Sequence, residues 1–507
     1  MQEIELKIEL DPKSEQRVRR TKWPGTYWSE QPVTRTLRSI YFDTVDQRLA
    51  SAGMALRLRK AGRSWTQTVK LGHEMNLGLS TADEHSCPAP GGRLVIDSIP
   101  DPDVVGRLKE QIHGNALAPV FETQMRRTTR LVRVRDAIIE IAVDVGQITA
   151  AEKSEPLREL ELELVAGDPR ALFELLKHLL PDGGLAISAC SKADRGRALA
   201  NDLIAEVENV PRRATRVEFS PEEPVAEVIK GTLTEVCLQV TANHRLAMIE
   251  ITPDLLKQLR IGLRRFRSAL SLFKRQIGGS KVDHLNEEAR WFAGEIAKVR
   301  DLDVVLTDIL APERELHEDP GLDALDGELQ HRLTVARRRF QPVLAGERVQ
   351  SFLIDLLAFT MAHPWDRLLD KPIASVGGKM LDRRWRKVTE CAVELDRFSI
   401  EQRHDLRKLL KKMRYSVEFL RSIYPDEELS PFLKRLKRLQ TVFGDLNDAA
   451  MLEGMLYGPE APLADDPQAQ RALGRLVGAR MARADFAWEK AQTMWDDLVQ
   501  IPCYWKE

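Results

Sequence analysis

Hydrophobic and polar residues alternate with a period of two in the first part of the chain. This pattern predicts β-strands that pack one face in a core, and Gly, Asp and Pro residues separate the strands. The predicted strands are EIELKIEL, RSIYFD, ALRLRK, WTQTVK, RTTRLVRV, AIIEIAVDVG and RELELELV. A helix is predicted near the end of this region, at Ala171–Leu180.

The pattern changes to a helical period from about Glu218 onward, and the strand patterns disappear. Such a period is typical of amphipathic helices that pack in bundles. Pro and charged residues at Val210–Arg213 and Ser220–Pro224 predict a linker and the start of the first long helix. We therefore expect a multidomain α+β protein, with a strand-rich domain at 1–203, a linker at 204–217 and an all-α domain at 218–505.

The helical part contains an internal repeat. The segment KQLRIGLRRFRSALSLF from Lys257 aligns with HDLRKLLKKMRYSVEFL from His404, at an offset of 147 residues. The same offset places Arg300-Asp301 against Asn447-Asp448. Two motifs that share one offset indicate a duplication, so we predict related helical bundles at about 218–310 and 370–505. A variable connection that includes the charged segment Glu313–Arg339 separates them.

Charged side chains occupy the second face of several predicted strands. Alternate residues of a strand share a face, so Glu3, Glu5 and Lys7 lie together. Taken alone, one such face is as compatible with the water-exposed side of an ordinary β-sandwich as with a binding site. Further faces of this kind carry Arg57 and Arg59; Lys70; Thr123, Arg127 and Thr129; Glu140 and Asp144; and Glu159, Glu161 and Glu163. Aligned like charges repel by about 1 kcal/mol per pair in water, so segregated carboxylates and cations favour a metal site beside an oxyanion site.

The segments EIELK, IYFDT, ALRLR, QTVK, ELELEL and SKADRG occur in this order within about residues 1–200. In these motifs the chain resembles the CYTH family of triphosphate tunnel metalloenzymes. The resemblance implies an eight-stranded antiparallel β-barrel that closes into a tunnel, with the charged faces inside. It also implies binding of linear triphosphates with Mg²⁺ or Mn²⁺ and, for many members, hydrolysis of inorganic triphosphate.

The resemblance and the side-chain chemistry together suggest roles for these residues. Carboxylates bind hard divalent ions, whereas Arg and Lys bind phosphate oxygens. The expected metal ligands are Glu3, Glu5, Glu161 and Glu163, with Glu159 and Asp144 as secondary candidates. The expected triphosphate-binding residues are Lys7, Arg57, Arg59, Lys70, Arg127 and Lys192. Glu5 and Lys7 are the candidate catalytic residues. Taken alone, Lys192 fits a surface lysine better, and its place in the family order favours the phosphate role.

One segment departs from the family pattern. Family members carry an R-x-E-x-E strand after the strand that ends at Lys70, whereas this chain has Ala82-Asp83-Glu84-His85-Ser86. The Arg and the second Glu are therefore missing. Because loss of one such group can lower a rate by orders of magnitude, a barrel that binds phosphate chains without hydrolysing them is the alternative.

One helix of each repeat carries a stripe of basic residues. A solvated helix face normally mixes charges, because like-charge pairs at i,i+4 destabilise a helix by a few tenths of a kcal/mol. Two basic stripes therefore favour a polyanion-binding surface over a merely solvated face. The residues are Lys257, Arg260, Arg264 and Arg267 in the first repeat, and His404, Arg407, Lys411, Lys412 and Arg414 in the second, where Lys434 and Lys437 add to them.

The motifs LRIGLRRFRSAL, HDLRKLLKKMRYSVEF, VRDLDV and LQTVFGDLND resemble the CHAD family of histidine-containing α-helical domains, over about residues 218–505. The resemblance implies a double four-helix bundle with a basic channel that binds inorganic polyphosphate. Lys257 replaces the family histidine in the first repeat, and His404 keeps it in the second. Asp301, Asn447 and Asp448 fit structural hydrogen-bonding roles better than ligand roles.

Composition narrows the partners further. The 76 Lys and Arg residues nearly balance the 77 Asp and Glu residues, so no global field attracts nucleic acid or an anionic membrane. No apolar run reaches the roughly 18 residues of a membrane-spanning helix, and the first residues do not resemble a secretory signal. The five cysteines are scattered, which indicates reduced thiols. A cytoplasmic location is expected, with polyphosphate granules as a candidate place.

The expected ligands are inorganic triphosphate for the barrel and long-chain polyphosphate for the helical domain. Nucleic acid is a weaker candidate, because Phe266 and Tyr415 are the few aromatic residues among the basic stripes. Adenylate cyclase activity, which the resemblance also allows, lacks a signature of a nucleotide-base pocket. The sequence leaves the oligomeric state open.

Overall fold

The structure of the chain is a computed structural model that describes residues 2–23, 25, 27–181, 183–188, 190–201, 210–363, 365, 370–457 and 461–506. The side chains of residues 2, 3, 73–76, 396, 400, 445–448, 456 and 457 lie outside this description. The chain divides into two compact units. One comprises Met1–Arg212 and Ala345–His363, and the other comprises Arg213–Leu344 and Pro364–Glu507.

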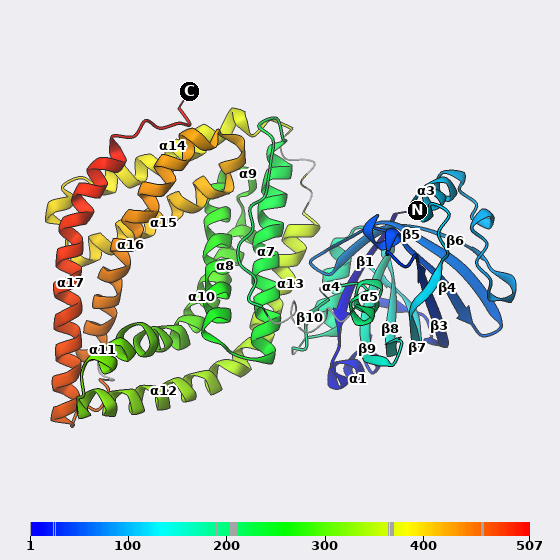
Figure 1. Ribbon diagram of the computed structural model, residues 1–507, viewed down its shortest axis with the longest axis horizontal. Helices are drawn as coiled ribbons and strands as arrows, with labels where there is room; N and C mark the ends of the chain where they lie inside the picture. Colours follow the sequence, from blue (N-terminus) through cyan, green and yellow to red (C-terminus); the bar gives the residue numbers. More distant parts are fainter. Residues whose placement is uncertain are drawn as a thin grey trace. The chain divides into compact units, whose positions relative to one another are not determined.

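The first unit is built on a closed antiparallel β-barrel (Figure 1). The strands pair in the order β1-β6-β5-β4-β3-β7-β8-β9, and β9 pairs back with β1 to close the barrel. Their bounds are β1 Gln2–Glu9, β3 Val33–Asp43, β4 Ala55–Ala61, β5 Ser64–Asn76, β6 Leu79–Pro88, β7 Ala118–Val134, β8 Ala137–Ala150 and β9 Lys153–Ala166. Short strands β2 (Tyr27–Ser29) and β10 (Ala186–Ile187) add to β7 and β1. The expected eight-stranded antiparallel barrel is confirmed.

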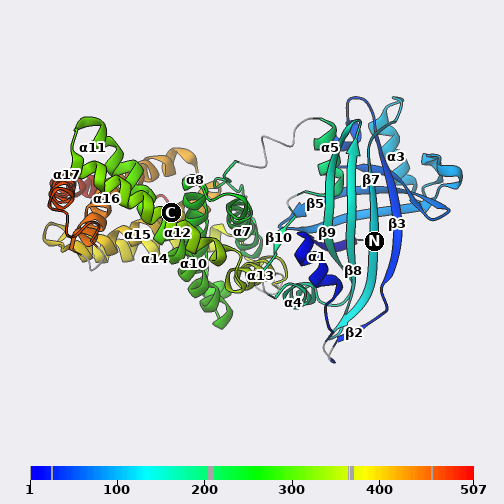
Figure 2. The same cartoon turned by 90° about the horizontal axis from the view of Figure 1, so that it is seen from below.

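Both faces of the strands that carry the charged motifs are buried. The register sets Lys7 opposite Glu161 and Arg127 opposite Asp144. Apolar neighbours such as Leu6 and Leu160, on the other face, are fully buried as well. Glu159 is 0% exposed and Lys7 5%, so the charged face points into the barrel and not to water. Figure 2 shows the long strands β3, β7 and β8 running side by side.

Helices cover parts of the barrel. They are α1 (Pro12–Arg19), α2 (Arg48–Ser51), α3 (Pro102–Ile112), α4 (Arg170–Leu179), α5 (Lys192–Ala200) and α13 (Glu347–Met361), together with short 3₁₀ turns at Pro90–Gly92 and Ile96–Ser98. Helix α4 lies where the sequence predicts a helix. Helix α13 packs on α4, and Lys177 forms a 2.7 Å ion pair with Asp355. The structure thus groups α13 with the barrel, although its sequence lies inside the range predicted for the helical domain.

The second unit is helical. Its first half contains α7 (Val225–Ile249), α8 (Pro253–Leu272), α9 (Lys274–Ile277), α10 (Ser280–Val304) with a π-helical continuation (Val305–Leu310), α11 (Ala311–Leu316) and α12 (Pro320–Leu344). Its second half contains α14 (Ala374–Cys391), α15 (Ile400–Phe419), α16 (Asp426–Tyr457) and α17 (Pro467–Val499), with 3₁₀ turns at Leu395–Arg397 and Arg421–Ile423. Among the described residues, no helix is both long and apolar enough to span a membrane.

The helix bounds confirm the internal duplication. Helix α8 begins at Pro253 and α15 at Ile400, and the α10 continuation ends at Leu310 where α16 ends at Tyr457. Both pairs differ by the offset of 147 residues seen in the sequence. Within the unit, α8 packs on α7, α10 and α15, and α16 packs along α17 (Figure 1). The apolar stripe of α8, which includes Phe266, is buried in this core.

Helix α5 lies close to the barrel because of one glycine. A Cβ atom added at Gly196 would lie 2.1 Å from the ring of Phe121, and that ring is buried and stacks on Tyr41 at 4.3 Å. We predict that Gly196→Ala lowers the free energy of unfolding by about 1–3 kcal/mol, because the packed ring must shift. Urea unfolding of the full chain measures this effect.

Gly106 in α3 is the matched control, since a Cβ atom there would have no neighbour within 4 Å. Gly106→Ala should leave stability unchanged or raise it by up to about 1 kcal/mol, as expected for Ala in a helix interior. Equal effects of the two substitutions would contradict the packing argument.

Candidate functional site

A cavity of about 330 Å³ lies inside the barrel. Its walls come from β1, β3, β4, β5, β6, β7 and β9 and from the start of α5. The charged lining residues are Glu5, Lys7, Arg57, Arg59, Lys70, Glu84, Arg127, Glu161, Glu163, Lys192, Asp194 and Arg197. Cations outnumber carboxylates in this lining, so the cavity is suited to an anion.

The structure brings together most of the residues predicted from the sequence. The six predicted triphosphate-binding residues, Lys7, Arg57, Arg59, Lys70, Arg127 and Lys192, all line the cavity, and so do the predicted metal ligands Glu5, Glu161 and Glu163. Asp144 and Glu159 lie deeper and are fully buried. The side chain of Glu3 lies outside the described residues. The roles of all these residues stay predictions.

Three charged lining residues were not among the site residues predicted from the sequence, although Glu84 matches the family's strand pattern. Glu84 faces Lys70 across the β5–β6 pair, where the two side chains form a 2.9 Å ion pair. Asp194 and Arg197 follow Lys192 in α5 and pair with each other at 2.6 Å. From the sequence, Asp194 and Arg197 could have been identified only by their i,i+3 spacing and by the SKADRG motif.

Buried ion pairs neutralise the carboxylates at the base of the cavity. The ammonium group of Lys7 lies 2.6 Å from Glu5 and 3.1 Å from Glu161. The guanidinium of Arg127 donates to both carboxylate oxygens of Asp144, at 2.8 and 2.6 Å, and to Glu161 at 2.5 Å. Such bidentate pairing is among the stronger hydrogen-bond geometries in proteins.

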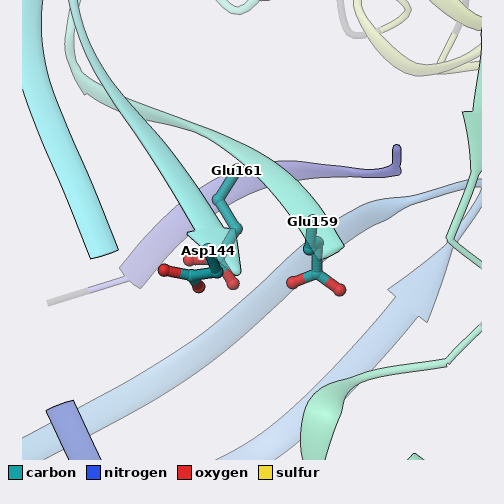
Figure 3. A group of neighbouring side chains, drawn as sticks. All are labelled: Asp144, Glu159 and Glu161. Atoms are coloured by element: carbon teal, nitrogen blue, oxygen red, sulfur yellow. The ribbon is translucent and has the colours of Figure 1, made fainter. Parts of the chain in front are cut away.

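Asp144, Glu159 and Glu161 form a buried acidic cluster (Figure 3). Each offers a carboxylate oxygen, and these atoms lie within 4.8 Å of one another. Oε2 of Glu159 is buried and has no hydrogen-bond partner among the described residues. Hard oxygen donors with a spare lone pair fit a divalent ion such as Mg²⁺ or Mn²⁺.

The environment separates the pKa values of two carboxyl groups in this cluster. Burial raises the pKa of Glu159 to about 7, although Lys192 opposes the change. Burial also acts to raise the pKa of Glu161, but Lys192, Lys7 and Arg127 outweigh it and hold that pKa well below its ordinary value. Glu161 is therefore ionised at neutral pH, and Glu159 titrates near neutrality.

The opposite wall presents cations. Arg57 lies 3.5 Å from Glu84 and 3.4 Å from the hydroxyl group of Tyr41, while its buried Nε has no partner among the described residues. Burial and then the nearby Arg57 and Arg127 lower the pKa of Arg59 to about 10. Crowded, partly unpaired guanidinium groups are well suited to hold phosphate oxygens.

The segment that departs from the family pattern lies in β6. Ala82, Glu84 and Ser86 alternate along the strand and share a face. Ala82 is buried, and the hydroxyl oxygen of Ser86 lies 3.2 Å from Glu84 and 2.9 Å from the hydroxyl oxygen of Thr68. Glu84 is thus the one charged side chain that this face supplies.

A second basic cavity, of about 450 Å³, lies in the helical unit between α8, α10 and α15. Its cationic lining residues are Arg264, Arg267, Lys274, Arg290, Lys408, Lys411 and Lys412. Four of these belong to the predicted stripes, and the sequence analysis did not single out Lys274, Arg290 and Lys408. Helix α10 contributes Arg290, which a search of the basic helices alone could not find.

The remaining stripe residues lie elsewhere. Arg260 forms a 3.1 Å ion pair with Asp301, and Arg414 and Lys437 lie 3.8 and 3.5 Å from Glu418. His404 and Arg407 line a smaller cavity with Phe443. Lys257 and Lys434 are exposed. The side chains of Asn447 and Asp448 lie outside the described residues.

The CYTH domain family matches residues 1–196, and the CHAD domain family matches residues 232–457. The chain is a CYTH domain followed by a CHAD domain. The CYTH region is similar to an inorganic triphosphatase of Haemophilus influenzae, with 31% identity over 203 residues. That match covers 40% of this chain and 56% of the relative, so the chain spans little more than half of the relative's length.

Two further comparisons extend beyond the CYTH domain. An uncharacterized protein of Mycobacterium tuberculosis is 24% identical over 526 residues, which cover 91% of this chain and 92% of that protein. The crystal structure of the CHAD domain from the plant Ricinus communis aligns with a TM-score of 0.51 and 23% identity, over 58% of this chain and 98% of that domain. This likeness shows the fold of the CHAD domain.

Lys411 is the most perturbed lysine of the CHAD cavity. Burial lowers its pKa to about 7, and the neighbouring Arg407, Arg264, Arg260 and Arg414 add to the effect. The cause is geometric, because α8 and α15 pack together and both contribute cations to one cavity. An anion in the cavity would relieve this repulsion.

We predict that Lys411 reacts faster with an amine-acylating reagent at pH 7.5 than exposed Lys408, because its amine is largely neutral and nucleophilic. Peptide mass spectrometry after brief labelling measures both sites in one sample. Raising the pH from 6 to 8 should increase the labelling of Lys411 steeply around pH 7. A flat response of Lys411 over this range would refute the prediction.

Proposed function

We propose that the CYTH domain hydrolyses inorganic triphosphate or a short linear polyphosphate with a divalent metal ion, and that the CHAD domain binds long-chain polyphosphate. Hydrolysis by the CYTH domain is supported by one observation: arginines and lysines line the barrel cavity next to a buried cluster of carboxylates. The similarity to an inorganic triphosphatase supports the same reaction.

In this proposal the cations and the carboxylates of the barrel have different roles. Arg57, Arg59 and Lys70 would hold the phosphate oxygens, because they are cations that line the cavity. Mg²⁺ or Mn²⁺ bound by the carboxylates would neutralise phosphate oxygens and lower the pKa of a bound water. Lys7 and Arg127 stand beside the carboxylates and would stabilise charge that develops on the leaving group.

The reaction consumes one water molecule. The water oxygen forms a bond to the terminal phosphorus and its proton passes to solvent, while the bridging P–O bond breaks and diphosphate leaves with the electron pair of that bond. Phosphate and diphosphate are the products. Glu5 lies 2.6 Å from Lys7 and is 4% exposed, and in this proposal it would orient the reacting groups beside Lys7.

We predict that Glu5→Gln lowers phosphate release from tripolyphosphate with Mg²⁺ or Mn²⁺ by about 100-fold or more, because a preorganised charge is lost. A phosphate assay on the full chain measures the effect. Glu122→Gln is the matched control, because Glu122 pairs with Arg38 at 2.6 Å and does not line the cavity. It should retain wild-type activity.

The alternative is a catalytically impaired, polyphosphate-binding and granule-associated protein, and the β6 face motivates it. Ala82 and Ser86 supply no charge where the family pattern has Arg and Glu. Wild-type protein that binds tripolyphosphate but shows no metal-dependent release above background would favour this alternative over hydrolysis.

For the CHAD domain we predict that the double variant Arg264→Gln, Arg267→Gln weakens polyphosphate binding by about tenfold or more, since each lost charge-assisted hydrogen bond contributes about 1.5–3 kcal/mol. The dependence of affinity on salt should also become shallower, because fewer counterions are released. Titration of the full chain with long-chain polyphosphate at several salt concentrations measures both. Lys490→Gln on α17 is the control and should change neither quantity.

A further inference from the structure

The three carboxylates of the Asp144–Glu159–Glu161 cluster share one partner, the ammonium group of Lys192. Nζ of Lys192 lies 2.6 Å from Glu161 and 3.0 Å from Asp144, and it also donates to Oε1 of Glu159. All four side chains are buried. One positive charge therefore lies among the oxygen atoms that would coordinate a divalent ion.

The start of α5 places Lys192 at this point. Ser191 caps the helix: its hydroxyl oxygen accepts from the backbone N–H of Asp194, and the Asp194 carboxylate accepts from the backbone N–H of Ser191. Gly196 lets the helix lie close to Phe121. The backbone of Lys192 is thus fixed, whereas its four-carbon stem is flexible.

The ammonium group and a divalent ion need the same lone pairs. Mg²⁺ takes oxygen ligands at about 2.0–2.1 Å, and an ammonium group donates to carboxylate oxygens at about 2.7–2.9 Å. Both cannot use the same oxygens of Glu159 and Glu161, and the two cations repel each other. An ion that takes the oxygens now bound to Lys192, which are Oε1 of Glu159 and Oε1 of Glu161, must displace Lys192.

The cavity offers Lys192 another place. Lys192 lines the open space together with Arg57 and Arg59. Rotation about its side-chain torsions would move the ammonium group from the cluster toward this space. A phosphate oxygen held there would accept its hydrogen bonds in place of the carboxylates.

We propose that Lys192 and a divalent ion compete for the Asp144–Glu159–Glu161 cluster, and that a phosphate chain in the cavity draws Lys192 away and admits the ion. The second half rests on the proposed function, whereas the competition does not. By linkage, the ion and the phosphate chain then strengthen each other's binding by the same factor.

Mn²⁺ binding to the full chain tests the proposal, measured from the paramagnetic resonance signal of free Mn²⁺. The probe for the cavity is a non-hydrolysable imido analogue of tripolyphosphate. Lys192→Met should bind Mn²⁺ about tenfold more tightly than wild type without the analogue, because a charge-assisted hydrogen-bond partner no longer competes. The analogue should tighten Mn²⁺ binding to wild type more than to this variant.

Lys70→Met is the matched control, because Lys70 is a lysine of the same cavity that lies 2.9 Å from Glu84 and 3.8 Å from Glu5, two carboxylates outside the Asp144–Glu159–Glu161 cluster. It should not bind Mn²⁺ more tightly than wild type. Equal Mn²⁺ affinity of wild type and Lys192→Met would overturn the competition. If Lys192→Met does not fold, as judged by circular dichroism, Lys192→Gln takes its place and keeps a neutral donor.

The outcome separates this proposal from the proposed function. Tighter Mn²⁺ binding by Lys192→Met, in a protein that neither hydrolyses tripolyphosphate nor responds to the analogue, supports the competition and rejects the proposed function. Hydrolysis of tripolyphosphate by wild type, with Mn²⁺ affinity unaffected by Lys192→Met, supports the proposed function and rejects the competition.

Discussion

Neutralisation of buried carboxylates is the constraint on which the barrel depends. Asp144 and Glu159 are 0% exposed, and an isolated charge at such a position is strongly destabilising. Lys192, Arg127 and Lys7 supply the compensating charges from α5, β7 and β1. Removing one partner of a buried pair typically destabilises a protein by about 3–5 kcal/mol. The stability of the closed barrel therefore depends on these ion pairs.

The same ion pairs prepare the cavity for exchange of partners. A phosphate chain offers oxygens to the cations, and a divalent ion offers charge to the carboxylates. Both halves of each buried pair would then find a new partner inside the barrel. The CHAD cavity differs from the barrel cavity. Several cations lie close together around Lys411 and repel one another. The buried carboxylates of the CYTH domain pair with cations of the same domain, whereas cations predominate in the lining of the CHAD cavity.

Local patterns predicted the elements well and the cross-chain partners less well. The strand alternation correctly placed Glu5 with Lys7 on one face, and the offset between Lys257 and His404 recurs in the bounds of α8 and α15. The pairing of Arg260 with Asp301 and the grouping of α13 with the barrel were not predicted. Both depend on which helices meet in three dimensions, and a single helix pattern carries no information about its partner.

The sequence alone determined which residues share a strand face or a helix stripe, because the periods of two and 3.6 are properties of the backbone. The change of period along the chain determined the order of the two domains, and the repeated motifs determined the duplication. The strand pattern alone left open whether the charged strand faces point inward; the family resemblance implied that they do, and the tertiary structure decided it. The pairing of β1 with β9 closes the barrel around the charged faces and sets Lys7 beside Glu161 on the neighbouring strand. The tertiary structure also decided that Lys192, which by itself fits a surface lysine, is buried among three carboxylates, because capping and close packing of α5 direct its side chain there.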